Sequence, residues 1–160
     1  MIVQLRIDER LIHGQITTAW SRFLDVSRIV VASDKLAKDE LTTQTLLMSA
    51  PAGKKVAVRD IEATIKLLSD PRINTVRVLV IVDNPKDAVT LVKALGIEEV
   101  NVANYVKKKS KDKVKITTGV NSDPEDLVYF KELAQVTKHC FSQLIPSSPV
   151  EDFVGIVAKL

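Results

Sequence analysis

The chain has 160 residues, of which 46% are hydrophobic and 27% charged, a balance typical of a soluble globular protein with one domain over residues 1–160. The formal net charge of +3 and an aromatic content of 4% give no indication of nucleic-acid binding, because most basic residues are dispersed along the chain. The exception is the run Lys107-Lys108-Lys109, which we expect in a solvated loop. The most apolar segment, residues 76–82, is far shorter than the roughly 20 residues of a membrane helix. No secretory signal is evident, and one cysteine excludes an intrachain disulfide, so we expect a cytoplasmic protein.

Strand and helix patterns alternate along most of the chain. Runs of β-branched residues predict strands, and apolar residues spaced three and four apart predict helices. In chain order we expect strand 2–8, helix 15–24, strand 28–33, helix 36–49, strand 55–58, helix 61–68 and strand 76–82. The next helix is capped at Asp83-Asn84-Pro85, carries apolar residues from 88 to 95 on one face and ends at Gly96. Strand 99–103, strand 114–118, a long helix capped at 122 or 123, strand 140–145 and helix 153–160 follow. The alternation predicts a three-layer α/β/α fold, with a mainly parallel open sheet of six or seven strands and helices on both faces.

The most informative segment runs from Leu5 to Gln15, between the first expected strand and the first expected helix. It combines His13, one of two histidines, with two arginines, two carboxylates and Gly14. In open α/β proteins ligands bind beyond the carboxyl ends of the strands, and the start of a helix offers free N–H groups and a positive dipole end. His13 therefore lies where a side chain could hold or receive a phosphoryl group.

Two interpretations of His13 are open on the residues alone. It is either a surface or capping histidine beside a helix start, or a nucleophile that forms a covalent intermediate. For the second, Arg10 offers a planar fork of donors that suits phosphate oxygens, and Asp8 could orient Arg10 or the imidazole. Spacing by itself does not decide between the two.

The ends of the other strands supply further polar residues that should converge near His13. Ser33, Asn84 and Asn104 are weak candidates to line the site, because Asp, Asn and Ser also favour turns and helix caps. His139 precedes an apolar strand far along the chain, and we expect it to be structural or on the surface. Cys140 lies in that strand and is expected to be a core thiol.

Several common fingerprints are missing. The chain has no G-x-G-x-x-G after its first strand and no G-x-x-x-x-G-K-[ST], so it lacks the dinucleotide and nucleoside-triphosphate motifs. It has no H-x-x-x-H spacing and no nucleophile-elbow serine. We therefore expect neither a metal site nor a cofactor.

The segment Arg6-Ile7-Asp8-Glu9-Arg10-Leu11-Ile12-His13-Gly14-Gln15 resembles the active-site signature of the IIB components of the bacterial sugar phosphotransferase system, in the mannose/fructose/sorbose family. The resemblance extends over essentially the whole chain and includes Trp20, the segment 26–34, Asn84-Pro85 and the segment 100–102. One departure is Ala103-Asn104-Tyr105, where the family usually has a glycine-containing turn. It leaves the shape of the loop 103–113 open.

This resemblance implies a phosphocarrier enzyme without a cofactor. His13 would accept a phosphoryl group at Nδ1 from a phosphohistidine of a IIA protein or domain, and pass it to a sugar held by integral membrane IIC and IID proteins. Arg10, Gly14 and Gln15 would contact the phosphoryl group and Asp8 would be an orienting group. Arg6 would be structural or would contact a partner. The sugar and the oligomeric state stay open, a homodimer included.

The main alternative is a receiver-like signalling module phosphorylated on an aspartate. Asp8-Glu9 resembles the acidic pair that holds Mg²⁺ in such modules, and Asp60 would be the acceptor. Against it, the Lys-Pro expected at the end of the fifth strand is missing, and the segment after residue 120 would be surplus. A non-catalytic sugar-binding protein is a third option, for which the few aromatic residues leave few stacking surfaces.

Overall fold

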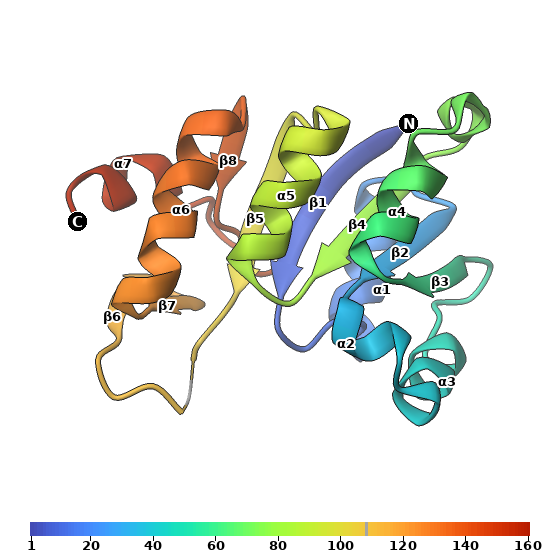
Figure 1. Ribbon diagram of the computed structural model, residues 1–160, viewed down its shortest axis with the longest axis horizontal. Coiled ribbons are helices and arrows are strands. Elements are labelled where there is room, and N and C mark those ends of the chain that lie inside the picture. Colours follow the sequence, from blue (N-terminus) through green and yellow to red (C-terminus); the bar gives the residue numbers. More distant parts are fainter. Residues whose placement is uncertain (108) are drawn as a thin grey trace.

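A six-stranded sheet forms the centre of the computed structural model, which describes residues 1–107 and 109–160 (Figure 1). Its strands run parallel in the order β3-β2-β4-β1-β5-β8. Their bounds are β1 Ile2–Asp8, β2 Arg28–Ala32, β3 Lys55–Arg59, β4 Val78–Val82, β5 Glu99–Asn104 and β8 His139–Phe141. Lys108 of the lysine run lies outside the described residues. The predicted α/β class with a mainly parallel sheet is confirmed.

Helices cover both faces of this sheet and complete three layers (Figure 1). The helices are α1 Gly14–Phe23, α2 Asp34–Ala37, α3 Glu40–Met48, α4 Ile61–Leu68, the short 3-10 helix η1 Pro71–Thr75, α5 Pro85–Leu95, α6 Pro124–Val136 and α7 Phe153–Ala158. Helices α4 to α7 pack on one face, whereas α1 and α3 lie on the other. No helix in the described ranges is both long and apolar enough to cross a membrane.

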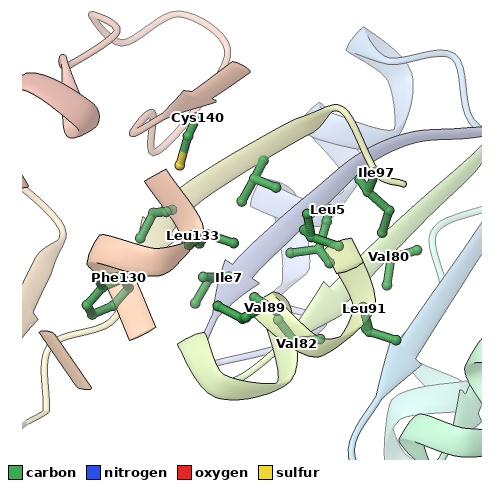
Figure 2. Packing of buried hydrophobic residues seen from close by; sticks show 14 of the residues in the cluster. Leu5, Ile7, Val80, Val82, Val89, Leu91, Ile97, Phe130, Leu133 and Cys140 are labelled. Carbon is green, nitrogen blue, oxygen red and sulfur yellow. The ribbon is translucent and has the colours of Figure 1, made fainter. Parts of the chain in front are cut away.

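The larger core cluster lies under α5 and α6. Figure 2 shows Leu5 and Ile7 of β1 facing Val89 and Leu91 of α5, with α6 beside them. Successive residues of β4 point to opposite faces of the sheet. Val80 belongs to this cluster, whereas Leu79 and Ile81 belong to the core cluster on the other face. A strand that is buried on both faces consists almost entirely of apolar residues, which explains why β4 falls in the most apolar segment of the sequence.

Three predicted elements differ in the structure. The helix expected over 36–49 is two helices, because Asp39 accepts a hydrogen bond from the backbone N–H of Thr42 (3.0 Å) and starts α3 afresh. The strand expected over 140–145 ends at Phe141, since the backbone N–H of Gln143 donates to the side chain of Asn101 instead of continuing the ladder. The strand expected over 114–118 is β6, Val114–Thr117, which pairs with β7, Val120–Ser122, in a separate antiparallel hairpin.

The strand order decides what surrounds the end of β1. Because β1 lies between β4 and β5 and all three run parallel, their carboxyl ends meet at one edge of the sheet. The loop after β1 is therefore flanked by the segments that begin at Asp83 and Asn104. Such an edge is where open α/β proteins bind their ligands.

Candidate active site

His13 occupies the N-cap position of α1 with its side chain exposed to solvent. The loop that carries it is fixed from both ends. Leu11 adopts a left-handed conformation (φ 61°), its N–H donates to the carbonyl of Asp8 (2.9 Å), and its side chain and that of Ile12 are buried. On the helix side, the backbone N–H of His13 donates to the hydroxyl of Thr17 (2.8 Å). The imidazole does not cap its helix, so it remains available for chemistry.

Asp8 forms the buried centre of a charged network behind this loop. Its side chain is 1% exposed and accepts hydrogen bonds from the Nε and Nη2 of Arg10 (3.0 and 3.1 Å) and from the backbone N–H of Arg10 (3.0 Å). Its second oxygen also accepts from the Nη2 of Arg6 (3.1 Å). Asp8 thus fixes one edge of the Arg10 fork, while the side chain of Arg10 is still 31% exposed.

Arg6 is the buried member of this network. Its guanidinium donates to the carbonyls of Leu144 (3.1 Å) and Gln143 (3.4 Å) and lies over the ring of Trp20 at 5.3 Å. Burial lowers the pKa of Arg6 to about 10, and Asp8 opposes that shift. Arg6 stays cationic at neutral pH and ties β1 to the segment after β8, which agrees with the structural role considered for it.

Gly14 and Gln15 form the exposed first turn of α1. Gly14 has φ 46°, a conformation that residues with a Cβ rarely adopt, and apart from its chain neighbours and the backbone of its own helix nothing lies within 4 Å of the position its Cβ would take. The N–H groups at this end of a helix have no partner inside the helix and lie at its positive pole. An anion beside His13 could therefore accept hydrogen bonds from the backbone N–H groups of the first turn, because no side chain at Gly14 blocks its approach.

The three weak candidates from the other strand ends fall into two classes. Ser33 caps α2 by accepting from the N–H of Leu36 (3.3 Å), and Asn84 caps α5 by accepting from the N–H of Asp87 (2.9 Å). Both are committed to helix starts. Asn104 pairs with Asp8 in the sheet, and its Oδ1 is buried without a hydrogen-bond partner in the described structure. Of these three residues, Asn104 alone thus presents a buried side-chain oxygen without a partner among the described residues.

The loop after β5 is anchored to the His13 loop. The N–H of Glu9 donates to the carbonyl of Asn104 (3.0 Å), and the carboxylate of Glu9 accepts from the N–H of Val106 (3.0 Å). Further along, the Tyr105 hydroxyl donates to Asp126 (2.6 Å) and Lys107 pairs with the same carboxylate (2.8 Å). Segment 103–107, whose departure from the family pattern left its shape open, is therefore held at the site.

Residues expected outside the site are found away from it. His139 begins β8 and so lies at the amino-terminal edge of the parallel sheet, opposite to the edge that carries His13. Burial raises the pKa of the Cys140 thiol to about 12, which agrees with a core cysteine. Asp60 caps α4 by accepting from the N–H of Ala63 (2.7 Å), after an edge strand separated from β1 by β2 and β4.

Sequence reasoning missed several partners of the site. Thr17 carried a weak signal, because a hydroxyl one turn into a helix can reach its first residues. The carbonyl of Leu144 gave no signal in the sequence, since it binds both Arg6 and the indole N–H of Trp20 (2.8 Å) through the backbone.

Within residues 1–107 and 109–160 no group of three or more His, Cys, Asp or Glu side chains could hold a metal ion. The arrangement combines an exposed imidazole, a cation fixed by a buried carboxylate, and a helix start.

Comparison with known proteins places the chain among phosphotransferase components. The model of the family described as the sorbose subfamily IIB component of the PTS system matches residues 2–160. A probable phosphotransferase enzyme IIB component of Streptococcus pyogenes serotype M6 is 40% identical over 153 residues, which cover 92% of this chain and 94% of that protein. The sorbose-specific EIIB component of Lacticaseibacillus casei is 33% identical over 162 residues, covering 100% and 96%.

A solved structure has the same fold. The crystal structure of the IIBSor domain of the sorbose permease from Klebsiella pneumoniae superposes with a TM-score of 0.91 at 29% identity. The match covers 99% of this chain and 97% of that one. Sequence and fold therefore agree over nearly the full length of both.

Proposed function

This chain belongs to the mannose/fructose/sorbose family of IIB components, the sugar phosphotransferases of the PTS, and from that premise we propose that His13 is the residue that carries the phosphoryl group. The observation that supports this most directly is the exposed imidazole at the N-cap of α1, behind which Asp8 fixes Arg10. We further propose that residues 1–160 act as a single IIB domain. The family model matches nearly all of them.

Acceptance of the phosphoryl group is a nucleophilic displacement at phosphorus. The neutral imidazole of His13 contributes its lone pair to a new N–P bond, through Nδ1 as the family resemblance implies. The N–P bond of the donor phosphohistidine breaks, and the donor imidazole keeps that electron pair. In the second step a sugar hydroxyl oxygen attacks the phosphorus and forms the new O–P bond. The N–P bond at His13 breaks, its imidazole nitrogen keeps that electron pair, and the hydroxyl proton passes to solvent. Phosphoryl transfer of this kind depends mostly on positioning and charge stabilisation.

The neighbouring residues suit these requirements. Asp8 binds the Nε and Nη2 of Arg10, so the other edge of the fork, at Nη1, remains for phosphoryl oxygens. Gly14 leaves the start of α1 open, and the N–H groups of Gly14 and Gln15 add preorganised positive potential. We assign Arg10, Gly14 and Gln15 to phosphoryl binding and Asp8 to the orientation of Arg10. None of these roles requires a cofactor.

The family also implies partners on both sides of this step. Membership implies a IIA protein or domain upstream and integral membrane IIC and IID proteins downstream. We propose that a phosphohistidine of IIA is the donor and that a sugar held by IIC and IID is the acceptor. A cytoplasmic location with peripheral association at the permease follows from these two contacts. The receiver-like alternative loses support, because the carboxylate of Asp60 is committed to the start of α4.

The experiment that tests this proposal locates the phosphoryl group. The protein is labelled through the upstream phosphocarriers, kept in alkali, which preserves phosphohistidine and destroys aspartyl phosphate, and analysed by mass spectrometry. One phosphoryl group on His13 is expected. His13→Ala should fold, because the side chain is exposed, and should neither accept the group nor support sugar phosphorylation. His139→Ala is the matched control and should keep both activities. A label on His139 or on a carboxylate would overturn the assignment.

A further inference from the structure

An uncharged groove begins beside His13, between α1 and the segment 145–147. It has a volume of about 500 Å³ and is lined by Gln15, Ile16, Ala19, Phe23, Ile145, Pro146 and Ser147. Two of its apolar side chains are open to solvent: Phe23 is 64% exposed and Ile145 37%. Exposed apolar side chains gathered in one hollow indicate a surface that another molecule covers.

The walls of this groove are held in place from below. The indole N–H of Trp20 donates to the carbonyl of Leu144 (2.8 Å), which fastens α1 to the segment after β8. The hydroxyl of Ser148 accepts from the N–H of Ile145 (3.1 Å) and donates to its carbonyl (2.8 Å). The side chain of Gln143 donates to the carbonyls of Pro146 and Ser148 (3.2 and 2.8 Å). A surface fixed in this way loses little conformational entropy when a partner binds.

Charge distinguishes this flank of the site from the flank beyond β4. There, Asp34, Asp60 and Glu62 line a hollow with a single lysine, Lys38. The pKa of Asp87 at the start of α5 is raised, mainly by burial and also by the charges of Asp83 and Asp34. A partner that presents a phosphorylated histidine carries negative charge at its contact surface. Carboxylates on the β4 side would repel it, whereas no lining residue of the groove is charged.

We propose that this groove is the docking surface for the phosphorylated IIA protein, which packs an apolar side chain against Phe23 and Ile145 while its phosphohistidine meets His13. The inference rests on the proposed function, because both imidazoles must reach one phosphorus atom during transfer. The IIA protein must therefore cover the part of this chain's surface that lies within one helical turn of His13. Gln15 and Ile16, the second and third residues after His13, already line the groove, so the groove and the transfer site are continuous.

The test compares two phosphoryl donors on the same variants. One donor is the cognate phosphorylated IIA protein, and the other is phosphoramidate, which releases ammonia and presents no docking surface. Phe23→Ser removes an exposed ring from the groove. Leu41→Ser is the matched control, because Leu41 lies on α3, is 79% exposed and does not line the groove. The readout for each donor is the rate at which His13 is phosphorylated, as a function of donor concentration.

With IIA as donor, Phe23→Ser should lower kcat/KM at least about tenfold through a higher KM, the size of effect typical of a truncated interface anchor. With phosphoramidate its rate should equal that of the unmodified protein, and Leu41→Ser should match the unmodified protein with both donors. Unchanged kcat/KM in Phe23→Ser, an equal loss in Leu41→Ser, or a parallel loss with both donors would each overturn the docking surface. Failure of the proposed function looks different, since the unmodified protein would then accept nothing on His13 from either donor.

Discussion

At the scale of single residues, the site depends on how one carboxylate is shared between two arginines. Asp8 binds buried Arg6 on one side and partly exposed Arg10 on the other. Arg6 of the first pair also binds the carbonyl of Leu144 and so attaches β1 to the segment after β8. The second pair fixes the guanidinium of Arg10, which lies in the loop before His13. A role for Asp8 in orienting Arg10 could be predicted from their spacing. The structural half of the network could not, because its acceptor is a backbone carbonyl more than 130 residues away.

Arg10→Lys should slow phosphoryl transfer while leaving the fold intact. A lysine ammonium keeps the charge but cannot bind Asp8 with one edge and a phosphoryl group with the other. The loss of one charge-assisted contact of roughly 1.5–3 kcal/mol corresponds to about one to two decades in rate. Rapid-quench measurement of transfer from phosphorylated IIA, with circular dichroism as a check on folding, would show this. A folded variant with unchanged kinetics would remove Arg10 from the mechanism.

Asp8→Ala should destabilise the protein strongly, apart from any effect on transfer. It leaves the guanidinium of Arg6, which is 3% exposed, without its counter-charge. Removing one partner of a buried ion pair costs roughly 3–5 kcal/mol. Urea denaturation followed by circular dichroism measures the change in the free energy of unfolding. Glu132→Ala is the control, because it breaks the pair with Lys93, which is 55% exposed, and should have a much smaller effect. Similar losses in both variants would contradict the proposed importance of burial.

At the scale of elements, residue types next to helix ends predicted where helices begin and end, whereas the pairing of strands was harder to predict. The cap at Asn84 and the left-handed Gly96 that ends α5 (φ 63°) follow from residue type, and both agree with the structure. The hairpin of β6 and β7 was missed in part because β7 is three residues long and lies outside the main sheet, to which a bridge between Val120 and Tyr105 connects it. Where a backbone leaves a ladder for a side-chain partner, as at Gln143, no periodic pattern in the sequence records it.

Asp87→Asn should stabilise the protein near neutral pH. In the folded state the pKa of Asp87 is raised above the ordinary value of 3.8, first by burial. Between that ordinary value and the raised one, the folded protein binds more protons than the unfolded chain, so stability falls as pH rises through this interval. Asparagine removes the ionisation and can still accept from Asn84, whose amide donates to Asp87 (2.8 Å). Thermal melts should show a higher Tm at pH 7 and a gain that disappears near pH 4.

Asp123→Asn, at the start of α6, provides the control of opposite sign. Its pKa is lowered, first by the hydrogen bond that its carboxylate accepts from the N–H of Asp126 and also by Lys107. A lowered pKa contributes stability above the ordinary value of 3.8, and this contribution is lost as pH falls through the folded value. The substitution should therefore lower Tm at pH 7. The same direction of change in both variants at neutral pH would contradict this electrostatic account.

At the scale of the whole molecule, the order and the direction of the strands decide what lies near His13 and what lies far from it. The α/β class and the position of His13 after a first strand were predictable from periodicity and composition. The order β3-β2-β4-β1-β5-β8 was not, because it depends on which strands pair in space. That order gives the site an acidic flank beyond β4 and an uncharged one beside α1. The polarity of the parallel sheet then leaves His139 at the far edge.

Cys140 offers a measurement of how firmly the edge of this sheet is held. It is the only cysteine of the chain, it is 9% exposed on edge strand β8, and burial raises its pKa to about 12. At pH 8 the native thiol should react with a disulfide reagent such as Ellman's reagent at least about a hundredfold more slowly than in the unfolded chain, where a thiol pKa near 8.5 is expected.

The reaction rate should also report the opening that exposes the thiol. If β8 opens only when the whole sheet unfolds, Asp8→Ala should speed labelling by the same factor as its loss of stability in urea, because labelling then follows the population of the open state. Glu132→Ala should leave the rate nearly unchanged. Rapid labelling of the native protein, insensitive to Asp8→Ala, would instead show that β8 detaches locally. The carbonyl of Leu144, which follows β8 and binds both Arg6 and Trp20, would then be a weaker support for the site than the hydrogen bonds suggest.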